Sequence, residues 1–120
     1  MTIGDIRIST VEMPHGAIVS LGLRFDLDGH SIGYATDFDA VTPEMEALFT
    51  GLDVWIVDAL RRQPHPTHPH LAMTLGAIER VRPRRAILTH MDQSMDYATL
   101  AAELPAGVAP GYDGLEAIAG

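Results

Sequence analysis

The stretch "HSIGYATDFDAVTPEMEALFTGLDVWIVDA", residues 30–59, decides the fold class of this chain. It begins with a short apolar run and continues into a segment with helix signals. Thr42 and Pro43 are typical of a helix start, and Gly51 is typical of the residue just past a helix end. The stretch ends in a continuous apolar run at 53–59, which predicts a strand covered on both faces. These features together predict a β-α-β unit.

Upstream of this unit, the sequence predicts a hairpin. The segment "DIRISTVEM" (5–13) alternates apolar and polar residues, as a half-buried strand does. The apolar segments 17–27 and 30–36 flank Asp28-Gly29, a dipeptide that favours a tight turn between antiparallel strands. We therefore expect antiparallel strands at one edge of the sheet.

Downstream, the same alternation of strand and helix continues. The predicted elements are a helix over 71–81, a buried strand over 84–90, a helix over 96–104 and a closing pair of short strands within 107–119. From residue 30 the order is β-α-β-α-β, which implies parallel strands joined by right-handed crossovers. The fold class is therefore α/β, with a mixed sheet in which the hairpin precedes the parallel part.

Composition limits the function. The net charge of −8, with arginine as the only basic residue besides histidine, argues against a nucleic-acid partner. No apolar run reaches the roughly 18 residues that cross a bilayer, and "MTIGDIRIST" lacks the pattern of a signal peptide. We therefore expect a soluble, cytoplasmic protein without a membrane partner. Because the chain has no cysteine, any metal site must be built from His, Asp and Glu.

Three such residues follow the predicted parallel strands directly. Asp37, Asp58 and His90 each come at the end of an apolar run, and the carboxyl ends of parallel strands meet at one edge of a sheet. Each residue alone suits a turn or a hydrogen-bonded loop, but three at one edge favour a shared site. His15, before the second strand, fits a loop residue and a metal ligand equally well.

With these residues in view, the chain resembles the second half of a metallo-β-lactamase-fold hydrolase. The resemblance is carried by "PHG" (14–16), "YATDFD" (34–39) and "ILTHMD" (87–92). It implies the C-terminal half of an αββα sandwich, with residues 1–120 as one partial domain. The HxHxDH signature of the first half does not occur in this sequence.

The resemblance also implies a metal site. In it, His15, Asp37 and His90 are ligands of two divalent ions, Zn²⁺ or Mn²⁺, and Asp37 is the bridging carboxylate. Such ions lie roughly 3.5–4 Å apart and offset charge that develops on a substrate. Asp58 is then an acceptor that orients a ligand histidine.

The segment "VDALRRQPHPTHPHL" (57–71) and the ending "LPAGVAPGYDGLE" resemble the phosphodiesterase branch of that superfamily, which includes phosphoribosyl cyclic phosphodiesterase. The resemblance makes His68 the residue that handles the proton of the leaving group, and Asp37 and His68 the catalytic pair. Prolines on both sides of His68 restrict its loop. We expect His65 to be exposed, His70 to lie at the next helix start, and His30 to be structural.

The sequence supports two main functional hypotheses. The first is a metal-dependent hydrolase, most simply a phosphodiesterase acting on a small or cyclic phosphodiester, which needs an N-terminal half and is inactive without it. The second is a truncated, non-catalytic α/β fragment that binds metal weakly and functions by association. An acidic regulatory module is a third hypothesis, but it leaves His68 and His90 without a role. Because the central strands are apolar on both faces, we expect a homo-oligomer or a complementing N-terminal half as partner.

Overall fold

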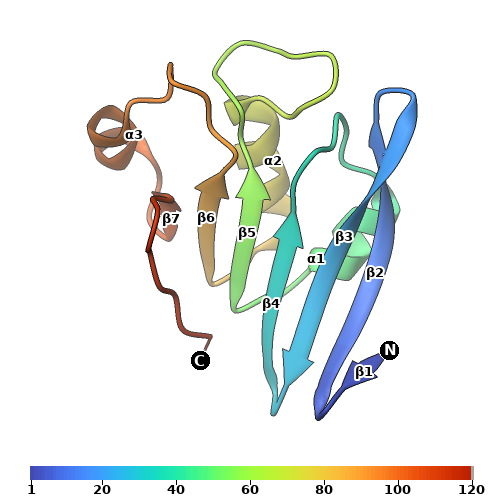
Figure 1. The fold of residues 1–120 in the computed structure, drawn as a ribbon. Helices are drawn as coiled ribbons and strands as arrows, with labels where there is room; N and C mark the ends of the chain where they lie inside the picture. The colour runs from blue at the N-terminus through green and yellow to red at the C-terminus, as the bar shows by residue number, and fades with distance from the viewer. Residues whose placement is uncertain (120) are drawn as a thin grey trace.

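A computed structural model of the chain describes residues 1–119 and consists of one mixed sheet with three helices (Figure 1). Its strands lie side by side in chain order, from β1 to β7. The strands are β1 (Thr2–Ile3), β2 (Ile6–His15), β3 (Ile18–Leu27), β4 (His30–Ala35), β5 (Val54–Asp58), β6 (Arg85–Thr89) and β7 (Val108–Pro110). The helices are α1 (Pro43–Phe49), α2 (Leu71–Val81) and α3 (Tyr97–Glu103). The predicted α/β fold class is confirmed.

The sheet changes direction at β4. Strands β1 to β4 are antiparallel, and β4 to β7 are parallel. The turn between β3 and β4 is formed by Asp28 and Gly29, both with positive φ (50° and 78°), as tight hairpin turns require. The expected hairpin followed by β-α-β-α-β is therefore present, and it places the carboxyl ends of β4, β5 and β6 at one edge.

Helices α1 and α2 lie on the same face of the sheet and bury the core against it (Figure 1). The Thr42 hydroxyl caps α1 by accepting a hydrogen bond from the Met45 amide at 3.2 Å. Trp55 on β5 and Phe49 on α1 are fully buried, with their rings 5.2 Å apart. A side chain at Gly33 would collide with Leu52, which lies beside them, so only glycine lets the helix layer approach β4 this closely.

The opposite face of the sheet is apolar and only partly covered. Gly22 and Gly33 point toward the α1 layer, so the alternating neighbours Leu21 and Tyr34 point away from it. These side chains are 56% and 41% exposed. Over β5 and β6 the same face is partly covered: Val54 and Ile87 are buried, and residues 111–117 line one side of an open hollow of about 430 Å³ above them. The sequence predicted an uncovered face over the central strands, whereas the exposed apolar side chains lie on the antiparallel strands β3 and β4.

The C-terminal segment differs from the prediction of two closing strands. One strand forms, Val108–Pro110, which pairs with β6, and residues 111–119 have no regular structure. Pro110 has no amide hydrogen to donate, and Gly111 and Gly114 weaken a strand. The amide of Gly111 still reaches the Leu88 carbonyl at 2.8 Å, so the segment leaves the sheet just beyond β7. Over residues 1–119, no helix is long and apolar enough to cross a membrane.

Candidate metal centre

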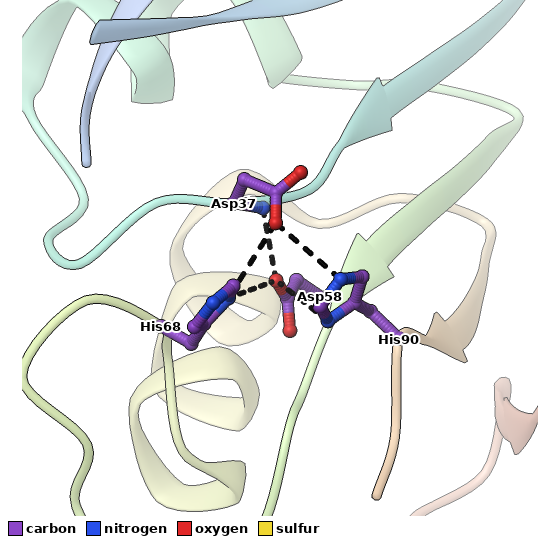
Figure 2. A group of neighbouring side chains, drawn as sticks. All are labelled: Asp37, Asp58, His68 and His90. Atoms are coloured by element: carbon purple, nitrogen blue, oxygen red, sulfur yellow. Dashed lines mark hydrogen bonds and ion pairs between the residues drawn. The ribbon is translucent and has the colours of Figure 1, made fainter. Parts of the chain in front are cut away.

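Side chains from the ends of three parallel strands and from one loop meet at the carboxyl edge of the sheet (Figure 2). Asp37 follows β4, Asp58 is the last residue of β5, and His90 is the first residue after β6. His68 comes from the loop between β5 and α2. Asp37, Asp58 and His90, the three predicted strand-end residues, thus lie together in the structure. His68 joins them from its loop.

The backbone turns sharply where two of these side chains are presented. Asp37 and His90 have φ values of 63° and 59°, in the left-handed region that Asp and His tolerate better than most residues. The Asp37 amide donates to Asp58 Oδ2 at 2.9 Å, and the Ser20 hydroxyl donates to the Asp37 carbonyl at 2.6 Å. Hydrogen bonds from two other strands therefore hold the turn that aims the Asp37 carboxylate.

Asp58 and His68 form the buried half of the cluster. Asp58 is fully buried, and its Oδ2 lies 3.3 Å from His68 Nδ1. Within the described part of the chain, Asp58 Oδ1 has no hydrogen-bond partner. Burial raises the pKa of Asp58, against the lowering effects of the Asp37 amide and of His68. A buried carboxylate that lacks a full set of donors favours a nearby positive charge.

Asp37 and His90 form the open half. Their side chains are 40% and 41% exposed, and His90 Nε2 lies 3.4 Å from Asp37 Oδ1. The same Asp37 oxygen lies 3.6 Å from His68 Nδ1. The His68 and His90 rings stack with centroids 4.9 Å apart. Solvent therefore reaches the cluster from the side of Asp37 and His90.

The loop that carries His68 is closed at its neck. The Leu60 amide donates to the Pro69 carbonyl at 3.0 Å, and the Leu71 amide donates to the Arg61 carbonyl at 2.9 Å. These bonds return the chain to the end of β5 before α2 begins. His68 is therefore fixed by both ends of its loop as well as by the flanking prolines.

His15 lies beside the cluster rather than within it. It is the last residue of β2 and pairs with Ile18 across a tight turn, so it is not a loop residue. Its Nδ1 lies 2.8 Å from the Thr67 carbonyl oxygen, and its ring is 5.0 Å from the His68 ring. Because a carbonyl oxygen only accepts, Nδ1 carries the hydrogen, and in the neutral ring Nε2 then keeps a free electron pair. A histidine that binds a metal commonly donates one ring N–H to such an acceptor and coordinates the ion through the other nitrogen.

The other histidines are distributed as follows. His70 lies at the start of α2, as expected, and His30 lies near Asp53 at the opposite edge of the sheet. His65 was expected to be exposed, but it is half-buried and accepts a hydrogen bond from the Thr67 amide at 3.1 Å. Desolvation, followed by the charge of Arg61, lowers the pKa of His65. The close spacing of His65 and His68 in "HPTH" was the feature of the sequence that could have indicated their ring contact.

The side chains of the cluster fit a divalent ion. Asp37, Asp58, His68 and His90 each offer a donor atom, and these atoms lie within 4.8 Å of one another. Carboxylate oxygen and imidazole nitrogen are donors that Zn²⁺ and Mn²⁺ accept. Four donors can surround one tetrahedral ion, whereas two ions require more than this group offers. Asp58 and His68, which the sequence did not predict to be ligands, are therefore within reach of an ion as well.

Comparison with known proteins identifies the family. A family model described as the beta-lactamase superfamily domain matches residues 1–91. The chain belongs to this superfamily. Its members are metal-dependent hydrolases, and the fold described above is a fragment of the metallo-β-lactamase fold.

The proteins that this chain is similar to differ in how much of their length it covers. A diphosphatase of the PhnP family is 30% identical, with a TM-score of 0.88 over 96% of this chain and 44% of its own. Zn²⁺-bound PqqB from Methylobacterium extorquens is 14% identical, with a TM-score of 0.72 over 94% of this chain and 50% of its own. A protein named octanoyltransferase from Porphyromonas gingivalis is 25% identical over 97% of this chain and 23% of its own length. The chain thus spans half or less of each of these proteins.

Proposed function

We propose that this chain contributes the C-terminal half of a two-metal site that hydrolyses a small or cyclic phosphodiester. The observation that carries the proposal is the pairing of a buried Asp58–His68 couple with an open Asp37–His90 couple at one sheet edge. The first couple suits proton transfer and the second suits metal binding. The 30% identity with a diphosphatase supports chemistry at phosphorus.

The open couple would hold the metal. Asp37 and His90, together with the free Nε2 of His15, are the ligands that this chain would offer, and Asp37 has two oxygens with which to bridge two ions. Zn²⁺ or Mn²⁺ bound there would supply Lewis-acid stabilisation of the phosphate oxygens. Asp58 would orient the two histidines beside it, since its Oδ2 lies 3.3 Å from His68 Nδ1 and 3.8 Å from His90 Nδ1.

The buried couple would handle the proton of the leaving group. When water attacks phosphorus, it gives up a proton to the solvent, the bond from phosphorus to the leaving oxygen breaks, and that oxygen takes up a proton. Asp58 holds the Nδ1–H of His68, which leaves the Nε2 proton for transfer to the leaving oxygen. The closed neck of the loop keeps the imidazole in place during this transfer.

A complete site requires a partner surface. The exposed apolar face of β3 and β4 would pack against a complementing N-terminal half or a second copy of this chain, which would bring the further ligands. An exposed contiguous apolar face of this kind favours association. The isolated chain should therefore self-associate, and light scattering that finds a stable monomer would contradict this part of the proposal.

A non-catalytic metal-binding fragment is the second candidate, and it too is supported by a specific observation. Four donors suffice for one ion, and the two outer ones remain about 40% exposed. Such a half-site would bind one ion weakly and leave the substrate without a second ion.

The two candidates separate in one experiment. The chain is titrated with Zn²⁺ and Mn²⁺ in a calorimeter, alone and with a polypeptide that carries the HxHxDH half. Each form is assayed on bis(p-nitrophenyl) phosphate, with p-nitrophenyl phosphate and pyrophosphate for comparison. We expect one weak site and no hydrolysis alone, and two sites with diester hydrolysis when complemented. Two tight sites on the isolated chain would contradict the half-site, and a complemented form that binds two ions without hydrolysing the diester would favour another substrate.

A further inference from the structure

Thr67, in the loop that carries His68, is hydrogen-bonded through both sides of its backbone to histidines. Its amide donates to His65 Nδ1 at 3.1 Å, and its carbonyl oxygen lies 2.8 Å from His15 Nδ1. The two histidines come from distant parts of the chain, one from the same loop and the other from the end of β2. Thr67 therefore links the His68 loop to the β2–β3 turn.

These two bonds select the tautomer of each ring in its neutral form. An amide N–H can only donate, so His65 Nδ1 is unprotonated and its hydrogen lies on Nε2. A carbonyl oxygen can only accept, so His15 carries its hydrogen on Nδ1. Thr67 thus sets the His15 tautomer that leaves Nε2 free, and His65 in turn holds Thr67.

Packing limits any other position for this loop. A side chain at Gly16 would come within 3.1 Å of the Thr67 methyl group, and Gly16 has a positive φ of 59°. The Gly16 amide is in turn tied to Asp39 Oδ2 at 2.6 Å. The His68 ring is in contact with both histidines, its centroid 5.0 Å from that of His15 and 5.1 Å from that of His65. A shift of Thr67 would therefore move the surroundings of His68 on two sides.

We propose that His65 is a positioning residue, which holds the Thr67 peptide so that His15 and His68 face the cluster in their required orientations. The side chain of His65 is outside the four-donor group, so it acts through the Thr67 backbone and not on the substrate. The consequence for turnover rests on the proposed function. The consequences for the Thr67 amide and the His15 tautomer do not.

The test uses two substitutions of His65 and one matched control in the full chain. His65→Ala removes the acceptor for the Thr67 amide. His65→Asn restores it, because the Asn Oδ1 takes the place of Nδ1 and can accept from the amide two residues on. His70→Ala removes another half-buried imidazole from the end of the same loop, one that makes no capping hydrogen bond to α2.

The first measurement is amide hydrogen exchange by NMR. In His65→Ala, exchange at Thr67 should become faster by about tenfold, which corresponds to the usual net strength of one hydrogen bond. His65→Asn and His70→Ala should exchange at the rate of the unaltered chain. The Leu60 amide, bonded to Pro69 across the neck of the loop, reports whether His65→Ala still folds and should not change. Unchanged Thr67 exchange in His65→Ala, with Leu60 protected, would overturn the proposal.

The second measurement is the ring-nitrogen spectrum of the histidines, which distinguishes the two neutral tautomers. His15 should be an Nδ1–H tautomer in the unaltered chain and in His65→Asn, and should become a mixture in His65→Ala. In the complemented, metal-loaded form, kcat should fall in His65→Ala with KM unchanged, and Asn should restore it. If the Thr67 and His15 signals follow this pattern but no diester is hydrolysed by any form, the proposed function fails and the positioning role stands. If His15 keeps one tautomer in His65→Ala, the positioning role fails.

Discussion

Strand β5 carries an aspartate–histidine pair at each of its ends, and the two pairs differ in their surroundings. Before the strand, Asp53 Oδ2 lies 3.5 Å from His30 Nδ1, and at its end Asp58 Oδ2 lies 3.3 Å from His68 Nδ1. Asp53 also accepts the Ser31 amide at 2.9 Å and lies 3.6 Å from an Arg84 guanidinium nitrogen. Asp58 is fully buried and has one oxygen without a partner among residues 1–119.

The pKa shifts of the two carboxyl groups run in opposite directions. The hydrogen bond from the Ser31 amide is the largest factor that lowers the pKa of Asp53, and His30 and Arg84 add to it. Burial is the largest factor at Asp58 and raises its pKa. A satisfied carboxylate ties strands together, whereas a buried and under-satisfied one next to a histidine is typical of a functional site. The same two residue types thus have carboxyl pKa values shifted in opposite directions at the two ends of one strand.

The largest difference between the ends should appear in turnover. In the complemented form, His68→Ala should reduce kcat by about 10²- to 10⁴-fold, the range for loss of a general acid, and most for substrates with poor leaving groups. His30→Ala removes the equivalent histidine at the other end and should leave kcat unchanged. Elemental analysis should find the same metal content in both variants. Metal lost from His68→Ala would make His68 a ligand instead of a proton donor.

The second largest difference should be in metal affinity, between a carboxylate at the carboxyl edge of the sheet and one at the opposite edge. Asp37→Asn keeps a residue that tolerates the left-handed backbone but removes the charge, so Zn²⁺ affinity should fall by about 100-fold or more, beyond the usual effect of residues that only orient ligands. Asp53→Asn makes the same chemical change at the other end and should leave the affinity as it was. Calorimetry on both variants measures this. An unchanged affinity in Asp37→Asn would mean that Asp37 is not a ligand, and an equal loss in Asp53→Asn would mean that the effect is not specific to the carboxyl edge.

The smallest expected effect is on the pH dependence of stability in the metal-free chain. The Asp53 pKa is lowered from 3.8, so its contribution is present above pH 3.8 and is lost as the pH falls through the folded-state pKa. The Asp58 pKa is raised from 3.8, so its contribution is present below pH 3.8 and is lost as the pH rises through the folded-state value.

Urea unfolding with a chelator measures both effects. Relative to the unaltered chain, Asp53→Asn should become less destabilising as the pH falls below 3.8. Asp58→Asn should become more favourable as the pH rises above 3.8, because it removes a carboxylate that is costly to bury. If the free energies of unfolding of the two variants, relative to the unaltered chain, changed with pH in the same direction, the opposite pKa shifts of Asp53 and Asp58 would be contradicted.

The sequence by itself determined the order of strands and helices and the edge at which the site lies. Thr42, Pro43 and Gly51 mark α1 through local backbone preferences, and Asp28-Gly29 sets the hairpin through its positive φ values. The direction of parallel strands then follows from the connecting helices, so Asp37, Asp58 and His90 could be assigned to one edge. These inferences needed only two things: patterns within a few neighbouring residues, and the order of the predicted elements along the chain.

Tertiary structure alone decided how the loops approach that edge. The contact between His15 and Thr67 joins residues 52 apart in the sequence, and no local pattern predicts it. His65 contacts the Thr67 amide and the His68 ring inside the folded loop, so an expected surface histidine proved half-buried. The segment after β7 lies over β5 and β6 without forming a strand, because beyond the Gly111–Leu88 hydrogen bond it contacts the sheet through side chains. Long-range hydrogen bonds and packing fix such segments, and the free energy of these contacts depends on partners that the local sequence does not contain.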